Sequence, residues 1–272
     1  MIERVVSLLC DPATHESLEV QVEFDRKGAQ QPLLANPKSG RRFPIREGIP
    51  VFLNEAEVSG LNRKYQKMYD WMAPGYDLAA KLYAYFKRTD LRQMRSGYLD
   101  ELEIRGGDQV LEVSVGTGIN VLLLPPNIDF YGLDISWGML EKCRQNLRGW
   151  KREANLFYGE AENLPFKSQS FDVVFHFGGI NFFNDKARAI REMIRVAKPG
   201  TKIVISDETE KHVQSVYEKT PLLGKYFRGR QEAVSPPTEL LPQGMLDVRL
   251  KELREGRLYC LTFRTPAQPF AL

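Results

Sequence analysis

Apolar and polar residues follow one another along this 272-residue chain in patterns that change near residue 55. Before that point, short apolar runs typical of strands alternate with polar turns, at residues 18–24, 31–34 and 42–53. Between residues 61 and 100, Tyr, Met, Leu and Ala recur at the three- and four-residue spacings of a helix. We therefore expect a small β-rich module over residues 1–55 and a helical segment over residues 56–100.

From residue 101 onward, strand-like and helix-like segments alternate. We expect strands at 110–115, 156–158, 171–177 and 202–206, and helices at 139–150 and 187–196. Such alternation predicts an α/β fold with a mostly parallel sheet and helices on both of its faces. Two further apolar runs, 244–250 and 257–263, flank a turn and predict an antiparallel hairpin that closes this sheet.

Composition and charge limit the class of protein. Hydrophobic residues make up 43% of the chain, enough to bury a substantial core, and the net charge is only +3. A dedicated nucleic-acid-binding protein would be far more basic. No apolar run approaches the ~20 residues of a membrane span, and no secretory signal precedes the first module. Cys10, Cys143 and Cys260 are widely scattered, so we expect a cytoplasmic protein without disulfides.

Residues 110–120 carry the first candidate chemistry. An apolar run ends at Gly116 and Gly118, where the backbone can turn sharply and approach a ligand closely. Asp134 follows at the end of the next apolar run. An acidic side chain at this place can bind the hydroxyls of a ribose, so the pattern predicts a nucleoside cofactor.

The same stretch distinguishes between nucleoside cofactors. A dinucleotide site needs a small residue where this chain has Val121, and the Lys-Ser/Thr ending of a triphosphate loop is missing. The order Glu112-x-Ser114-x-Gly116-x-Gly118 instead resembles motif I of the class I S-adenosylmethionine (SAM) methyltransferases. An ordinary glycine-rich turn between a strand and a helix is the alternative interpretation.

Three later segments strengthen the resemblance. Residues 160–166, Glu-Ala-Glu-Asn-Leu-Pro-Phe, are similar to the family segment whose acidic side chain and following amide meet the adenine. Residues 170–175 and 191–200 match the fourth strand and the helix after it. Together they resemble the ubiquinone/menaquinone C-methyltransferases, which implies a Rossmann-like class I methyltransferase fold and SAM as cofactor.

The resemblance also implies which residues surround the cofactor. Tyr76 lies in a Tyr-Asp segment that folds over the cofactor in the family, and Pro125 and Pro126 must end the first helix early. That short helix would place Asn120 beside the methionine end of the cofactor. The implied cofactor-binding set is Tyr76, Glu112, Ser114, Gly116, Gly118, Asn120, Asp134, Ile135, Glu160, Ala161 and Phe177.

The N-terminal module resembles a degenerate zinc ribbon of the kind found with some methyltransferases. Of its two ligand pairs only Cys10 remains, and Ala13, Asn36 and Ser39 stand at the other three positions. His15 would raise the number of ligands to two at most, whereas a structural zinc needs four. We expect no metal, and a role as a β-rich lid or packing platform.

Two side chains at strand ends are catalytic candidates. A general base is required only when the methyl acceptor carries a proton that must leave. His176 ends the fourth strand and Glu208 the fifth, at the edge where open α/β sheets bind ligands. A histidine packed below the cofactor and a solvated carboxylate are the equal alternatives.

The sequence predicts a SAM-dependent methyltransferase that acts on a small, apolar acceptor such as a quinone precursor, a lipid or a thiol. One alternative is methylation of RNA or protein, with the N-terminal module as a recruiter; the low net charge makes nucleic acid the weaker partner. Another is a SAM-binding partner subunit that has lost catalysis. A peripheral contact with a membrane surface and the oligomeric state stay open.

Overall fold

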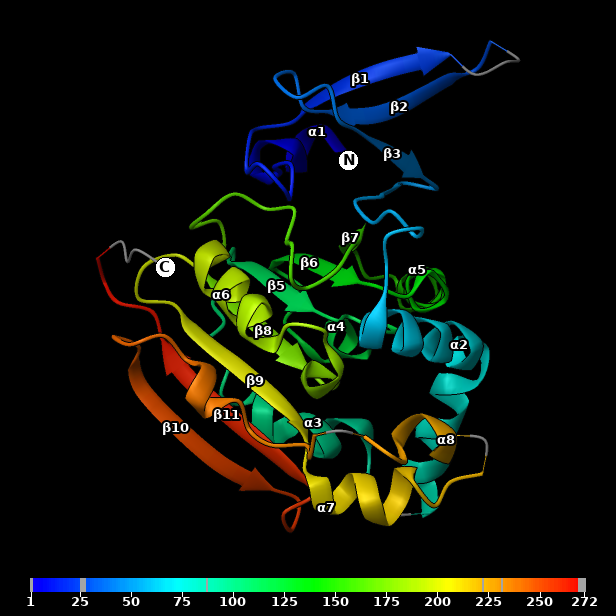
Figure 1. The fold of residues 1–272 in the computed structure, drawn as a ribbon, viewed down its shortest axis with the longest axis vertical. Coiled ribbons are helices and arrows are strands. Elements are labelled where there is room, and N and C mark those ends of the chain that lie inside the picture. Colours follow the sequence, from blue (N-terminus) through cyan, green and yellow to red (C-terminus); the bar gives the residue numbers. More distant parts are fainter. Residues whose placement is uncertain (1, 25–27, 87, 222, 231, 269–272) are drawn as a thin grey trace.

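A seven-stranded sheet forms the centre of the computed structural model, which describes residues 2–24, 28–86, 88–221, 223–230 and 232–268 (Figure 1). In spatial order its strands are β10 (Leu246–Leu253), β11 (Leu258–Arg264), β9 (Lys202–Glu208), β8 (Val173–Phe177), β5 (Gln109–Val113), β6 (Asp129–Asp134) and β7 (Asn155–Tyr158). The five strands from β9 to β7 are parallel, and the hairpin β10–β11 adds antiparallel to β9. The predicted fold class is confirmed.

Side chains alternate along these strands and divide the core into two layers. On one face, Leu111 and Val174 belong to an apolar cluster with Ile190 and Met193 of α6 (Lys186–Val196). On the other face, neighbouring strand residues pack with α3 (Leu91–Leu99), α4 (Ile119–Leu123) and α5 (Trp137–Trp150). This two-residue period decides which strand-end side chains share one face of the sheet.

Helix α2 (Gly60–Phe86) lies across the carboxyl ends of the strands, and smaller helices complete that side (Figure 1). They are η2 (Ile180–Phe182), α7 (Glu210–His212), the π-helical turn η3 (Val213–Tyr217) and α8 (Gly224–Phe227), whereas η4 (Thr238–Leu240) packs against α6. None of the helices within the described ranges is long and apolar enough to cross a bilayer.

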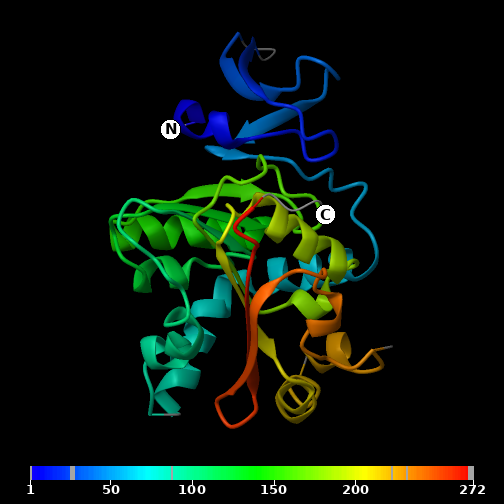
Figure 2. The same cartoon turned by 90° about the vertical axis from the view of Figure 1, so that its left-hand side faces the viewer.

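The N-terminal module contains α1 (Ile2–Val5), η1 (Val6–Leu8) and an antiparallel sheet: β1 (Glu19–Phe24), β2 (Gln30–Ala35), β3 (Arg42–Arg46) and β4 (Ile49–Pro50). It sits beyond the β7 edge of the large sheet (Figure 2). The Phe52 amide donates to the Tyr158 carbonyl over 2.8 Å, and the Cys10 amide to the Pro165 carbonyl over 3.0 Å. Leu9 and Leu34 also belong to the α6-side core, so the module packs as part of one continuous apolar interior.

Asp11 occupies the centre of the module where the resemblance would place a metal. Its buried carboxylate accepts hydrogen bonds from the Asn36 side chain at 2.9 Å, the Ala13 amide at 3.0 Å and the Arg41 guanidinium at 2.5 Å. The side-chain oxygen Oδ1 of Asn36 in turn accepts from the backbone amides of Lys38 and Ser39. Hydrogen bonds to the buried Asp11 carboxylate thus join the turn at Ala13 to the turn formed by residues 36–41. Among the described residues no group of three or more His, Cys, Asp or Glu side chains is arranged to hold a metal.

We expect Asp11→Ala to destabilise the protein by about 2–3 kcal/mol, because the buried Asn36 amide and part of the Arg41 charge lose their acceptor. The free energy of unfolding in urea measures this. Ser39→Ala is the matched control: its hydroxyl lies 3.4 Å from the same carboxylate on an exposed residue, so a loss below about 0.5 kcal/mol is expected. Equal losses in both variants would contradict a central role for Asp11.

Candidate functional site

A cavity of about 500 Å³ lies between the carboxyl ends of the central strands and helices α2, α3 and α8. Ten of the residues predicted from the sequence line it: Tyr76, Glu112, Ser114, Gly116, Asn120, Asp134, Ile135, Ala161, Phe177 and Glu208. Gly118, Glu160 and His176 lie outside this lining. The cavity therefore gathers most of the predicted set, including one of the two catalytic candidates.

The glycine turn after β5 has a left-handed backbone, with φ of 67° at Ser114, 56° at Gly116 and 79° at Gly118. A Cβ atom on Gly118 would lie 2.6 Å from the sulfur of Cys143, so this glycine is needed for the turn to pack on α5. A Cβ on Gly116 would meet nothing within 4 Å. The cavity wall thus has open space at Gly116. At Gly118 the absence of a side chain allows the turn to pack against Cys143 of α5.

Asp134 ends β6 beside this turn. Its carboxylate accepts from the Gly116 amide at 2.8 Å and from the Ser136 amide at 2.9 Å, and burial raises its pKa to about 6. Each oxygen keeps a lone pair for a ligand, because one amide occupies only one acceptor site. This arrangement fits a pair of ribose hydroxyls.

Glu112 carries an unpaired buried oxygen into the site. Its Oε1 accepts from the Asn120 amide at 2.6 Å, and Asn120 accepts from the Tyr98 hydroxyl at 2.8 Å, while Oε2 has no partner. Burial raises the pKa of Glu112 to about 8. The five-residue helix α4 holds Asn120 in this place, and it ends before Pro125 as predicted. A cationic ligand group would satisfy Oε2, which fits the ammonium of a bound amino acid.

Arg95 of α3 also lines the cavity; burial raises the pKa of Glu112 and of Tyr76, and the charge of Arg95 partly offsets this rise. Its Nε atom is buried without a hydrogen-bond partner. A cation close to the Glu112 carboxylate gives this end of the cavity one group of each sign. That pair matches the carboxylate and ammonium of an amino acid, and no sequence motif pointed to Arg95.

The acidic loop after β7 differs from the expectation by two residues. Glu160 does not reach the cavity; its carboxylate accepts from the Asn163 side chain at 2.6 Å and from Asn62 at 3.4 Å. Glu162 lines the cavity instead and accepts from Asn62 at 3.0 Å. Glu162, next to Ala161, is therefore the acidic residue of this loop that lines the cavity.

Two carboxylates hold α2 over the glycine turn. Asp70 accepts from the Ser136 hydroxyl at 2.6 Å and from the Gly138 amide at 2.9 Å, at the start of α5. Asp77 accepts from the Thr117 hydroxyl at 2.6 Å. Tyr76, next to Asp77, lines the cavity. The Tyr-Asp segment therefore closes the site as a fixed wall.

The two catalytic candidates lie on opposite faces of the sheet. His176 belongs to the α6 face of β8, is fully buried and contacts the Val113 carbonyl through Nδ1 at 2.9 Å. Burial lowers its pKa. Glu208 of β9 projects on the cavity side. The side-chain alternation along the strands thus brings Glu208 to the site and keeps His176 away from it.

Glu208 is bound by a residue that sequence reasoning missed. Tyr217, on the π-helical turn η3, donates its hydroxyl to Oε1 of Glu208 at 2.6 Å, and both line the cavity. Burial and the neighbouring Asp207 raise the pKa of Glu208 well above its usual value. No motif marks Tyr217, because it lies in a segment whose sequence has no regular apolar period.

Aromatic and apolar side chains line the cavity near this pair, together with His212 and Arg254. Tyr65, Met68, Phe182 and Phe227 form a buried cluster, in which the Tyr65 and Phe182 rings stack at 4.4 Å between centroids. Met72 and Tyr217 pack against it. The cavity therefore has two ends. The carboxylate-rich end lies at the glycine turn, and the aromatic end is the part lined by Tyr65, Met68, Phe182 and Phe227.

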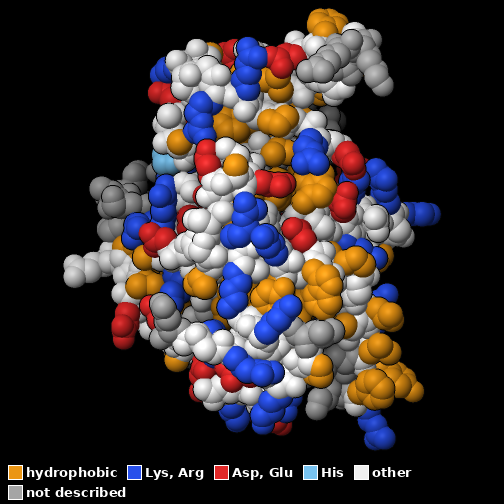
Figure 3. All heavy atoms as spheres, turned by 45° about the vertical axis from the view of Figure 1, so that its right-hand side comes forward, with side chains coloured by type: hydrophobic (Ala, Val, Ile, Leu, Met, Phe, Trp, Pro, Cys, Tyr) orange, Lys and Arg blue, Asp and Glu red, His pale blue; other side chains and the backbone are white. Residues whose placement is uncertain are grey.

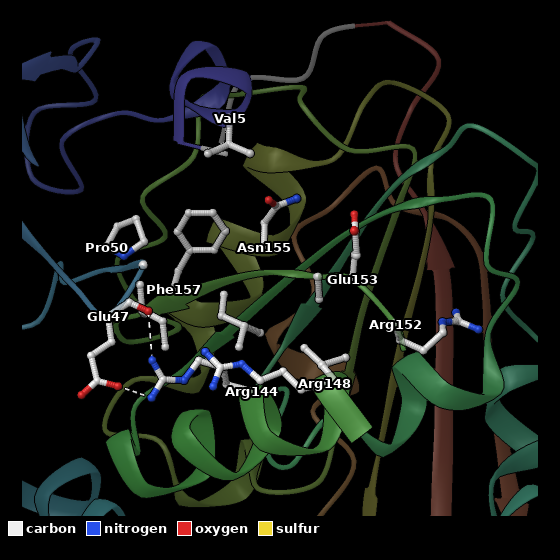
Figure 4. A pocket seen from close by; sticks show the side chains of 14 residues that line it. Val5, Glu47, Pro50, Arg144, Arg148, Arg152, Glu153, Asn155 and Phe157 are labelled. Atoms are coloured by element: carbon white, nitrogen blue, oxygen red, sulfur yellow. Dashed lines mark hydrogen bonds and ion pairs between the residues drawn. The ribbon is translucent and has the colours of Figure 1, made fainter. Parts of the chain in front are cut away.

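A second, smaller cavity of about 260 Å³ lies between the N-terminal module and α5 (Figure 4). Its Arg144 side chain binds the Glu47 carboxylate and, at 3.0 Å, the Glu47 carbonyl. Arg152 donates to the Leu124 carbonyl at 2.9 Å. These charges already have protein partners, and the cavity is remote from the carboxyl ends of β8 and β9, so it is not the candidate site.

Comparison with known proteins agrees with the geometry. Residues 111–205 match the family described as "Methyltransferase domain". A demethylmenaquinone methyltransferase of Thermotoga maritima is 30% identical over 185 residues, covering 63% of this chain and 78% of that protein. The corresponding enzyme of Paenarthrobacter aurescens is 28% identical over 156 residues, which is 57% of this chain and 59% of that protein. The chain thus matches about three fifths of the length of this second relative.

Solved structures share the fold at low sequence identity. The [4+2]-cyclase SpnF has a TM-score of 0.58 at 16% identity, and the match covers 77% of this chain and 98% of that one. The PH0226 protein of Pyrococcus horikoshii has a TM-score of 0.53 at 19% identity, covering 66% and 91%. These likenesses concern the fold alone.

We expect binding of S-adenosylhomocysteine, the demethylated cofactor, to release a proton from Glu112. The pKa near 8 leaves the carboxyl largely protonated at pH 7, and a ligand ammonium would favour the ionised form. Calorimetry in buffers of different ionisation enthalpy should count on the order of 0.5–0.9 proton released. Glu112→Gln should abolish the release and weaken binding about 10–100-fold, whereas Glu160→Gln should leave the release unchanged.

The same carboxyl should make the free protein less stable at alkaline pH. Because the pKa rises from 4.5 in the unfolded chain to about 8 in the fold, the folded state keeps a proton that the unfolded state has lost. The free energy of unfolding should therefore fall as pH rises across this window. Glu112→Gln should flatten the decline; an equal slope in both proteins would contradict the assignment.

Proposed function

The chain belongs to the class I SAM-dependent methyltransferases, and on this premise we propose that it methylates a small, apolar acceptor such as a quinone precursor, a lipid or a thiol. The aromatic end of the cavity carries the proposal. It adjoins the carboxylate-rich end without an intervening wall, since a single cavity includes both. A cofactor bound at one end would therefore face an acceptor bound at the other.

The polar end would hold SAM through side chains of this chain. Asp134 would bind the ribose, Glu112 and Arg95 the amino-acid end, and Glu162 with the Ala161 amide the adenine. SAM supplies a methyl group on a positively charged sulfur, which leaves as a neutral thioether when an acceptor electron pair forms the new bond to carbon. Buried carboxylates stabilise a cation in such a site, and their raised pKa values reflect how far they are removed from water.

The aromatic end would orient the acceptor and manage its proton. Rings of Tyr65 and Phe182 offer flat apolar contact of the kind that small aromatic ligands prefer. Glu208 would accept a proton from a phenol, thiol or activated carbon as the acceptor is methylated, while Tyr217 holds its carboxylate in place. A carboxyl whose pKa is raised by burial above its usual value is suited to this role.

The named acceptors of the relatives support the same substrate class. Demethylmenaquinone is a quinone, and it is the compound that appears in the names of the proteins from Thermotoga maritima and Paenarthrobacter aurescens. A base in RNA or a protein side chain would have to bind beside the buried apolar cluster to which α2 and η3 contribute Tyr65, Met68 and Val213. A small apolar molecule fits these walls better than a charged polymer does.

We expect Glu208→Gln to lower kcat about 100-fold or more, because the proton acceptor is lost, with little change in cofactor affinity. Tyr217→Phe should lower kcat about tenfold, since it only positions Glu208. His176→Gln is the matched comparison: it lies outside the cavity lining and should change stability rather than turnover. Kinetics with an accepted substrate and calorimetry with S-adenosylhomocysteine measure both effects. A large kcat loss in His176→Gln alone would reverse the assignment.

We expect label from methyl-labelled SAM, incubated with the protein and fractionated cell extract, to enter the organic-soluble fraction. The aromatic end of the cavity is the reason. Glu208→Gln and heat-denatured protein serve as controls. Label found only in RNA or protein would refute the proposed acceptor class, and absence of label from all fractions, despite S-adenosylhomocysteine binding, would favour a partner subunit without catalysis.

A further inference from the structure

The outer face of α2 exposes a stripe of large apolar side chains. Trp71, Leu78, Leu82 and Tyr85 are 58%, 63%, 48% and 77% exposed, and their spacings of seven, four and three residues place them on one line along the helix. Figure 3 shows orange side chains gathered on this flank, with blue Lys or Arg side chains beside them. Phe86, at 78% exposure, extends the stripe. Contiguous apolar surface of this kind marks an interaction site.

The exposed charges of α2 beside the stripe have one sign, and the segment after the helix carries the exposed Asp90 between two arginines. Lys67 and Lys81 are exposed along the same helix, and Arg88 and Arg92 follow its end. The acidic residues of α2 are Asp70 and Asp77, and both turn inward: Asp70 accepts from the Ser136 hydroxyl at the start of α5, and Asp77 accepts from the Thr117 hydroxyl in the glycine turn. Within the described part of α2, no exposed acidic side chain opposes these cations.

We propose that this face docks on an anionic membrane surface, with the apolar stripe at the boundary between headgroups and acyl chains. Trp and Tyr with an aliphatic core, flanked by Lys and Arg, is the side-chain set of helices that lie in a bilayer interface. A protein partner fits less well, because protein interfaces are depleted in lysine. The same helix lines the cavity with Met72, Tyr76 and Ala80 on its other side. Docking would therefore place the cavity wall against the phase in which apolar molecules dissolve.

The test is flotation of the protein with vesicles of phosphatidylcholine alone or with about 30% phosphatidylglycerol. Binding should be about tenfold stronger with the anionic lipid and should weaken at high salt. Leu78→Glu/Leu82→Glu should lower it at least about tenfold. The matched control is Leu246→Glu/Leu250→Glu, which makes the same change at two leucines of β10, each 49% exposed. It should stay within about twofold of the unmodified protein.

Trp71 gives a second readout that needs no destabilising variant. Brominated lipid should quench the tryptophan emission of the unmodified protein, and Trp71→Phe should remove most of the quenching, since Trp137 and Trp150 are only partly exposed. A retained thermal shift with S-adenosylhomocysteine would show that the variants are folded. This docking does not depend on the identity of the methyl acceptor.

Three results would overturn the proposal. The first is the absence of flotation of the unmodified protein with anionic vesicles. The second is an equal loss of binding in both leucine pairs. The third is a concentration-dependent dimer that Leu78→Glu/Leu82→Glu separates while vesicles bind neither protein, which would make this face a self-interface.

Discussion

The two-residue alternation of side chains along the parallel strands is the constraint on which the site depends. At the end of β8, Phe177 faces the cavity, so His176 must face α6. At the end of β9, Glu208 lines the cavity, whereas Asp207 does not line it and accepts from the Gly179 amide at 2.9 Å. A shift of one residue in either strand would exchange these roles. The core packing of both faces fixes the register and with it the chemistry.

Burial of several carboxylates around one cavity has a consequence for what the cavity can bind. Glu112, Asp134 and Glu208 all have raised pKa values because water is largely excluded from them. Such a site favours a ligand that brings positive charge, and it favours release of that ligand once the charge is gone. SAM is cationic and its product is not, so the same electrostatics would promote binding before the reaction and dissociation after it. The positive charge of Arg95 partly offsets the negative charges at the end of the cavity beside Glu112.

Sequence reasoning found the fold and most of the cavity because both depend on local patterns. The glycine turn, the acidic end of β6 and the Pro-terminated helix α4 are each encoded within a few residues. The failures occurred where the answer depends on side-chain direction or on distant segments. Nothing local distinguishes Glu160 from Glu162, and Arg95 and Tyr217 come from α3 and η3, which reach the site only through tertiary packing. His176 was expected at the site because it lies near the end of β8. That position alone does not decide to which face of the sheet the side chain points.

Helix α2 contributes to the cavity wall, to the packing of the glycine turn and to the exposed apolar surface. Its inner face closes the cavity, its carboxylates Asp70 and Asp77 fix it to α5 and to the glycine turn, and its outer face is apolar. A helix with only a structural role would gain nothing from exposing Trp71 and Tyr85, because apolar area left in water contributes no stability and promotes association. The exposure becomes reasonable if that face meets an apolar phase. An acceptor dissolved in that phase would then lie on the outer side of the helix whose inner side lines the cavity.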